Sequence, residues 1–356
     1  MGSKPPLANA GRFTGATDRV AVVVNGNARQ VTSELVDTLD QIVQSGDLFV
    51  SRSLEEGQDI ARVIVERGYP TVLTGGGDGT FVQMVTWVAR IAEELDRPLP
   101  RFGLLRLGTG NALAWVLGAQ SKQTRHAKGV VADLARLRRE GGSRLLRLLD
   151  VEGMLTPFAG LGADAIALEH HQRTREQLDR VRWLKPLASP AVTYALSIAT
   201  RSVPQYLFGR MPAFRVINNG SPASRLGQDG RPVGRDVKHG ETIYEGPATI
   251  LAFSTIPYWG LGARAFPYAD EREDRFSMRV VNFGSLEVVS HIREIWDGSY
   301  RSDRLHDFLA DDVIIECDTP TPLEVGGDVI GMRERTSAKL SKLPVRVVDY
   351  YSPPPT

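Results

Sequence analysis

The chain has a single cysteine, Cys317, among its 356 residues, and it has no long apolar run. One cysteine excludes an intrachain disulfide framework and argues against a structural zinc site built on thiolates. Without about 18 consecutive apolar residues, the sequence predicts no transmembrane helix. It also has no apolar N-terminal segment of signal-peptide type, so we expect a cytoplasmic protein.

The sequence also lacks an excess of positive or of negative residues. The 43 Lys and Arg residues nearly balance the 42 Asp and Glu residues, which leaves a net charge of +1. A near-neutral chain gives no electrostatic case for binding nucleic acid. The composition, 42% hydrophobic and 24% charged, is typical of a soluble globular protein rather than a disordered one. The length fits about two domains.

The first half of the chain alternates between strand-like and helix-like segments. A continuous apolar run at residues 20–24 is typical of a strand buried on both faces, and residues 48–50, 71–73 and 102–107 are also strand-like, with amphipathic helical spacing between them. Such alternation with short connections predicts a doubly wound α/β domain with a parallel sheet. We place this domain at residues 19–145.

The second half has a different pattern, because strand-like runs follow one another with Gly- and Pro-rich turns between them. One of these runs spans residues 145–151, and residues 218–240 read as an exposed loop. The pattern predicts a β-rich, antiparallel, sandwich-like domain at residues 146–330, interrupted by a helical segment at 165–200. We expect the last segment, 331–352, to pack back on the first domain.

The strongest local signal is a glycine-rich loop between an expected strand and an expected helix. It consists of Gly75, Gly76, Gly77, Asp78, Gly79 and Thr80. Glycines allow a close backbone approach to a ligand, and a helix N-terminus favours phosphate. Asp78 would repel that phosphate unless a cation lay between them, which implies a magnesium-bridged nucleotide. The alternative is that Asp78 only caps a helix.

Further polar residues follow other strands of the same expected sheet. Thr109 and Asn111 form part of a second glycine turn, Asn25 ends the first strand, and Ser53 follows the second. The carboxyl ends of parallel strands share one edge of the sheet, where ligands bind. Two of these residues have an alternative as helix caps: Asn111, and Ser53 with Glu56 as its capping-box partner.

These loops match neither the P-loop nor the Rossmann fingerprint. The Gly-Gly-Asp-Gly-Thr loop with its downstream Gly-Thr-Gly-Asn resembles the diacylglycerol kinase catalytic family, which includes sphingosine kinases and bacterial lipid kinases. The resemblance implies a kinase that uses ATP and Mg²⁺ to phosphorylate the hydroxyl of a diacylglycerol-like or sphingoid lipid. It places the nucleotide between an α/β domain and a β-sandwich domain.

The resemblance also assigns roles to single residues. Asn25 and Ser53 fall in nucleotide-binding loops, although the family's Pro and Ser-Gly near Asn25 are missing. A structural magnesium would be held by Asp274 together with Glu271 and the carbonyl of Phe276. There Arg275 replaces the glycine of the family.

The family's Asp-Gly-Glu segment, which carries catalytic carboxylates, corresponds to Gly326, Gly327 and Asp328. Phosphoryl transfer to an alcohol needs a base for the hydroxyl proton. We therefore predict Asp328 and Asp78 as the catalytic residues, with Glu324 near the former. The alternative for Asp328 is an ordinary turn residue.

The sequence indicates less clearly which residues would bind the lipid that accepts the phosphate. The aromatic segment of Tyr258, Trp259, Leu261 and Phe266 could line a lipid cleft or fill a core, and the basic stretch at 173–185 could lie on the inner face of a membrane or in solvent. An exposed edge strand would allow a homodimer. Two other functions stay open: a kinase with a soluble acceptor, related in fold to NAD kinases, and a non-catalytic nucleotide or lipid sensor.

Overall fold

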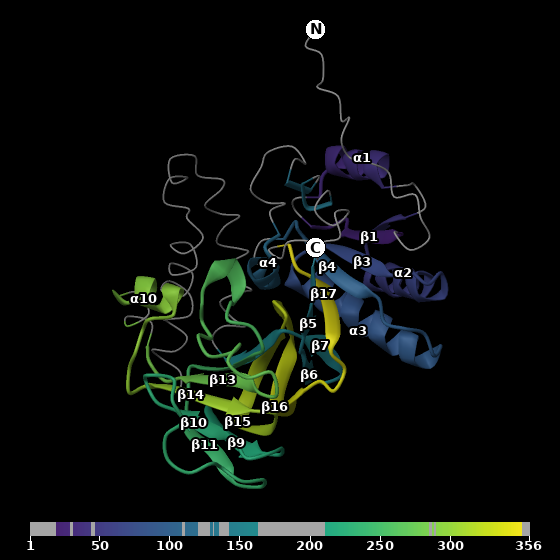
Figure 1. Ribbon diagram of the computed structural model, residues 1–356. Helices are drawn as coiled ribbons and strands as arrows, with labels where there is room; N and C mark the ends of the chain where they lie inside the picture. Colours follow the sequence, from purple (N-terminus) through teal and green to yellow (C-terminus); the bar gives the residue numbers. More distant parts are fainter. Residues whose placement is uncertain are drawn as a thin grey trace. The chain divides into compact units, whose positions relative to one another are not determined.

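The computed structural model describes residues 19–28, 31–43, 47–108, 111–119, 129–130, 132–134, 142–162, 211–284, 287 and 290–350 (Figure 1). The chain forms two compact units, of which unit 1 comprises Met1–Leu146 and Pro344–Thr356 and unit 2 comprises Arg147–Leu343. The predicted helical segment 165–200 and the basic stretch 173–185 lie outside the described residues.

Unit 1 is built on a parallel sheet. Its elements are β1 (Val20–Asn25), α1 (Ser33–Ile42), β2 (Leu48–Ser51), α2 (Leu54–Glu66), β3 (Thr71–Gly76), α3 (Asp78–Glu94), β4 (Arg101–Arg106), α4 (Ala112–Leu117), β5 (Ser143–Leu146) and β17 (Val345–Val348). The described strands form one sheet in the order β2-β1-β3-β4-β17-β5, in which β5 alone runs antiparallel to its neighbour. The predicted α/β fold is confirmed.

The apolar runs explain why these strands lie in the middle of the unit. Residues 20–24 of β1 are all buried, as a strand covered on both faces requires. The helices bury one face only: in α3 that face includes Phe81, Val85 and Val88. At the start of α1, the side chain of Thr32 accepts a hydrogen bond from the backbone of Leu35.

Unit 2 is built on antiparallel strands. They are β6 (Leu149–Val151), β7 (Met154–Thr156), β8 (Phe158–Gly162), β9 (Ala213–Asn218), β10 (Ser224–Leu226), β11 (Thr242–Pro247), β12 (Ile250–Ser254), β13 (Phe276–Val281), β14 (Leu305–Ala310), β15 (Asp312–Val325) and β16 (Asp328–Leu340). A 3₁₀ turn, η4 (Gly260–Gly262), and a short helix, α10 (Ile292–Asp297), lie between strands. The described strands join in one 11-stranded sheet, which confirms the predicted antiparallel β-rich architecture.

Three local expectations need correction. The run 145–151 is split between β5 in one sheet and β6 in the other, because the chain passes from unit 1 to unit 2 at residue 147. The predicted boundary at residue 330 falls inside β16, which pairs along its length with β15, so the boundary moves to residue 343. The expected loop 218–240 contains β10 and further strand-like pairing.

The C-terminal strand β17 completes the sheet of unit 1. It runs parallel to β4 and antiparallel to β5, so it separates two strands that are far earlier in the sequence. Its Val345, Val347 and Val348 are buried, whereas Arg346 is exposed. The segment therefore belongs to the core of unit 1. Among the described residues, no helix combines the length and the apolar character that crossing a membrane requires.

Replacing Val347 with alanine tests this position of β17. The side chain is 0% exposed, so Val347→Ala should lower the free energy of unfolding by about 2–3 kcal/mol through lost burial and a small cavity. Urea denaturation of the full chain measures the change. The matched control is Arg346→Ala on the same strand, and equal effects of the two substitutions would contradict the core position of β17.

Candidate functional site

Three loops of unit 1 follow neighbouring strands. β1 ends at Asn25, β3 at Gly76 and β4 at Arg106, and β3 lies between the other two in the sheet. The strands are parallel, so these loops share the carboxyl edge of the sheet, where ligands bind in this class of fold. Gly75 and Gly76 belong to β3 itself, and Gly77 alone separates the strand from α3.

Asp78 links two of these loops. Its side chain is buried, and its Oδ2 accepts a hydrogen bond of 2.9 Å from the backbone N–H of Ala112, while Oδ1 accepts one of 3.3 Å from that of Leu113. Both N–H groups belong to the first turn of α4. Asp78 therefore caps a helix, as the alternative reading allowed, but the helix is α4 rather than its own α3. The positive end of α4 compensates the charge of the carboxylate.

Asn111 links the same two loops in the opposite direction. Its Nδ2 donates a hydrogen bond of 2.9 Å to the carbonyl oxygen of Gly76, and the side chain is fully buried. The residue has φ 49°, a left-handed conformation that asparagine tolerates, and its side chain makes no capping hydrogen bond to α4. Its Oδ1 is buried and has no hydrogen-bond partner among the described residues, which leaves an acceptor for a ligand.

The first loop is tied to the second through α3. The Nδ2 of Asn25 donates to the hydroxyl of Thr80 at 3.3 Å, and its Oδ1 accepts from the backbone of Asn27 at 2.9 Å. Thr80 lies so close to Gly76 that a Cβ on this glycine would be 2.3 Å from the threonine Oγ1. A Cβ on Gly108 would likewise be 2.3 Å from the Cα of Gly77. At Gly108 a side chain is excluded because the backbones of the two loops approach each other closely, and at Gly76 it would meet the Thr80 side chain.

Ser53 is placed by a different interaction. Its hydroxyl accepts a hydrogen bond of 3.1 Å from the backbone of Glu56 at the start of α2, and the Glu56 carboxylate accepts one of 2.6 Å from the backbone of Arg52. This is the capping alternative described above, in a variant in which the acid reaches the residue before the cap. A role in nucleotide binding stays a prediction for Ser53. Thr109 lies outside the described residues.

The structure thus brings together Asn25, Gly76, Asp78, Thr80 and Asn111, and Gly79 lies in the first turn of α3. One further residue lies at the same sheet edge. Arg106, the last residue of β4, is buried, and its guanidinium lies 4.5 Å from the ring centre of Trp115. A cation–π contact therefore holds the guanidinium against the indole ring.

In unit 2, Asp328 follows the turn of the β15–β16 hairpin. Gly326 and Gly327 form the turn with φ 59° and 94°, and Asp328 pairs with Val325. The Asp328 side chain is exposed, yet partial desolvation by the surrounding protein raises the pKa of its carboxyl group above the ordinary value of 3.8. A carboxylate with a raised pKa is a better proton acceptor.

Glu324 fixes the geometry of this turn. The residue is on β15 and is 0% exposed, and its Oε1 accepts a hydrogen bond from the backbone N–H of Gly327. The N–H of Gly326 donates to the carbonyl of Phe158 at 3.1 Å, which ties the turn to β8. Asp328 therefore extends from a turn that is held on two sides, and Glu324 acts as a positioning residue for it.

Part of the chain matches a known protein family. Residues 19–138 match the model of the diacylglycerol kinase catalytic domain. The predicted family resemblance is confirmed. This diacylglycerol kinase catalytic match covers the three loops and the Asp78 contact. The residues of unit 2, Asp328 among them, lie outside it.

Individual known proteins also resemble this chain. The "Probable lipid kinase YegS-like" of Chromohalobacter salexigens is 32% identical over 100 residues, which are 27% of this chain and 31% of that protein. The alignment thus spans about a third of its length. Two solved structures of diacylglycerol kinases from Bacillus anthracis, one of them described as putative, cover 93% of this chain and 96% of their own at 14% identity, with TM-scores of 0.61 and 0.59. At that identity they show the fold alone.

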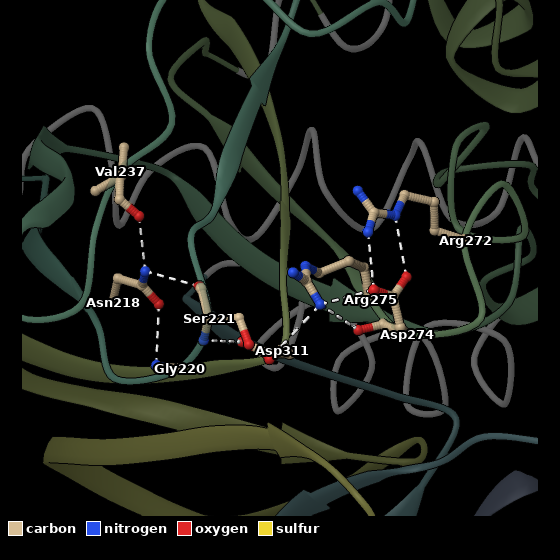
Figure 2. Close-up of polar contacts among 8 residues, drawn as sticks. All are labelled: Asn218, Gly220, Ser221, Val237, Arg272, Asp274, Arg275 and Asp311. Carbon is tan, nitrogen blue, oxygen red and sulfur yellow. Dashed lines mark hydrogen bonds and ion pairs between the residues drawn. The ribbon is translucent and has the colours of Figure 1, made fainter.

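The magnesium site implied for this family does not fit the residues present. The carboxylate of Asp274 accepts hydrogen bonds from the guanidinium groups of Arg272 and Arg275 (Figure 2). Glu271 is exposed, and Phe276 is the first residue of β13. Among the described residues, no three His, Cys, Asp or Glu side chains gather as a metal site would require. Two cations already occupy the positions around Asp274.

The aromatic segment after β12 forms a core rather than an open cleft. Phe266 is 0% exposed and stacks on Trp259 with ring centres 5.3 Å apart, and Trp259 also contacts Phe158. Ala252 and Ala269 complete this cluster. The packing alternative therefore holds for Trp259 and Phe266. Nothing is described for the side chain of Leu261.

Replacing Asp78 with asparagine tests the link between the loops. Asp78→Asn removes the charge and one acceptor at the start of α4, so unfolding should become easier by about 1–2 kcal/mol. Because the second loop then loses its anchor, ATP affinity measured by calorimetry should also fall. Asp59→Asn on the exposed face of α2 is the control, and unchanged stability and affinity in Asp78→Asn would rule out the linking role.

Proposed function

We propose that this chain is an ATP-dependent lipid kinase, which transfers the γ-phosphate of Mg-ATP to a hydroxyl of a diacylglycerol-like or sphingoid lipid. The observation that carries the proposal is the pair of reciprocal contacts between the two glycine loops, Asp78 to α4 and Asn111 to Gly76. The family match over residues 19–138 supports it. A lipid acceptor would bring the protein to a membrane surface.

In this proposal the loops of unit 1 hold the nucleotide. The backbone N–H groups at the start of α3, around Gly77 and Gly79, receive phosphate oxygens, because a helix N-terminus carries unpaired donors and a positive dipole end. The side chains of Asn25, Thr80 and Asn111 add polar contacts, and we assign Ser53 and Thr109 to the same set. Mg-ATP, when bound, supplies the phosphoryl group and neutralises its charge.

Asp328 takes the proton in the transfer step. The lipid hydroxyl oxygen forms a bond to the γ-phosphorus while the bond from that phosphorus to the bridging oxygen of ADP breaks. The hydroxyl proton passes to the carboxylate of Asp328, and ADP leaves. The raised pKa of this carboxyl group supports the assignment. Glu324 contributes by holding the Gly327 backbone and therefore the direction of Asp328.

The direct test is incubation of the full chain with γ-labelled ATP, magnesium and vesicles that contain diacylglycerol, sphingosine or ceramide. We expect one of these lipids to become labelled. Asp328→Asn should lower the rate at least about a hundredfold, because general-base catalysis contributes that much, and should leave ATP binding intact. Glu334→Gln, an exposed acid on the same strand, is the control. The absence of both ATP binding and labelled lipid would refute the proposal. If only soluble alcohols became labelled, the acceptor would be a soluble metabolite instead of a lipid.

The pH dependence of the reaction gives a separate prediction. Asp328 must be deprotonated to accept a proton, and desolvation raises its pKa above 3.8. The rate kcat/KM should therefore be constant at neutral pH and fall tenfold per pH unit on the acid side, starting above the pH at which an ordinary aspartate would protonate. A pH–rate profile of the wild type measures this. A profile whose acid limb survives in the residual activity of Asp328→Asn would assign the limb to another group.

One observation favours a second function, a non-catalytic nucleotide or lipid sensor. Gly326 stands where the family has an acid, so the hairpin presents one carboxylate fewer at that position. A sensor would bind ATP without turnover. Phosphotransfer that Asp328→Asn abolishes would exclude it.

A further inference from the structure

The segment before β13 contains two guanidinium groups on one carboxylate. Arg272 makes a paired contact with Asp274, with Nε to Oδ1 at 3.0 Å and Nη2 to Oδ2 at 2.8 Å. This two-fold geometry is the strongest form of carboxylate recognition that arginine offers. The hydrogen bond from Arg272 lowers the pKa of the Asp274 carboxyl group. The Arg272 guanidinium therefore already satisfies the carboxylate on one side.

Arg275 reaches from this segment to a second acid. Its Nη1 lies 3.0 Å from Oδ2 of Asp274 and 3.6 Å from Oδ2 of Asp311, and it also donates to the carbonyl oxygen of Asp274 at 2.8 Å. In Figure 2 its guanidinium lies between the two acids. Unlike Arg272, which is 48% exposed, the Arg275 side chain is only 13% exposed. A nearly buried cation thus faces two carboxylates.

Asp311 connects this pair to other loops of unit 2. It lies in the turn between β14 and β15, and its Oδ1 accepts a hydrogen bond of 2.9 Å from the backbone of Ser221. Its own carbonyl accepts the N–H of Leu340 at the end of β16. The Ser221 loop is held in turn by Asn218, whose Nδ2 donates to the carbonyls of Ser221 and Val237 (Figure 2). Three separate segments therefore meet at the two acids.

We propose that the guanidinium of Arg275 is the resident cation of this site: it bridges Asp274 and Asp311, and no divalent metal binds there. Without the guanidinium between them, the carboxylates of Asp274 and Asp311 would repel each other. Magnesium demands octahedral oxygen ligands at about 2.1 Å, and it would have to displace both arginines from Asp274. The two acids and two arginines already balance in charge. The family's glycine at position 275 could not provide such a group.

Thermal unfolding of the full chain, without nucleotide, tests the bridge. Arg275→Met keeps much of the side-chain length but loses the charge, so the melting temperature should fall by roughly 4 °C or more. Adding Asp311→Asn to this variant should restore part of the loss, because the repulsion between the acids is then removed. The control is Arg231→Met, whose side chain is 87% exposed and 3.8 Å from Asp229. A melting temperature of Arg275→Met equal to that of the wild type would overturn the proposal.

Binding of Mn²⁺, a spectroscopic substitute for Mg²⁺, tests the exclusion of metal. Electron paramagnetic resonance counts bound Mn²⁺ in nucleotide-free wild type and in Asp274→Asn. Equal numbers are expected, and an ion bound by the wild type but lost in Asp274→Asn would overturn the proposal. This comparison also decides the matter if Arg275→Met does not fold. Because neither measurement involves ATP or a lipid, their outcome is independent of the proposed kinase activity.

Discussion

The two hydrogen bonds from α4 to the carboxylate of Asp78 determine the geometry of the loop edge of unit 1. Without them α4 would begin after a left-handed Asn111 that offers no side-chain cap, and its first N–H groups would be buried without partners. Asn111 in turn holds the Gly76 carbonyl. The second glycine loop is thus shaped by the first, and neither would keep its conformation alone. Preorganised donors are what a phosphate site needs, because the cost of ordering them is met on folding.

The same contact changes the interpretation of an acid in a phosphate loop. From the sequence, Asp78 seemed to require a cation between it and any phosphate. In the structure its negative charge meets the positive end of α4, so the helix compensates the carboxylate in the absence of any ion. The requirement for magnesium at Asp78 therefore loses its premise. Magnesium would still arrive with the nucleotide, but its ligands need not include this residue.

Sequence patterns predicted the strands of unit 1 well, because continuous apolar runs such as that of β1 report burial on both faces. They could not show where the chain changes sheets. Residues 145–151 are apolar except for Arg147 and Asp150, and a run of this kind does not show which unit each part packs in. The capping partner of Asp78 was also out of reach. Capping rules relate residues three positions apart, whereas Ala112 is 34 residues from Asp78. Likewise, Arg275 was visible as a departure from a glycine, but its partner Asp311 comes from another turn of the sheet.

The residues that match the family's motifs are constrained sterically, whereas those that depart from the motifs act through charge. In unit 1, a Cβ at Gly108 would lie 2.3 Å from the Cα of Gly77, and one at Gly76 would lie 2.3 Å from the Oγ1 of Thr80. Both positions are therefore constrained sterically, and a side chain at Gly108 would separate the two loops. In unit 2, Asp328 and the cation at Arg275 act through charge, and charge can be supplied from a neighbouring position or by a different group. Glu324 buried behind the hairpin turn, and a guanidinium between Asp274 and Asp311, are both of this kind. Steric constraints therefore keep the glycine loops of unit 1 recognisable, while electrostatic ones leave unit 2 free to differ. The properties that distinguish this chain should be sought in unit 2.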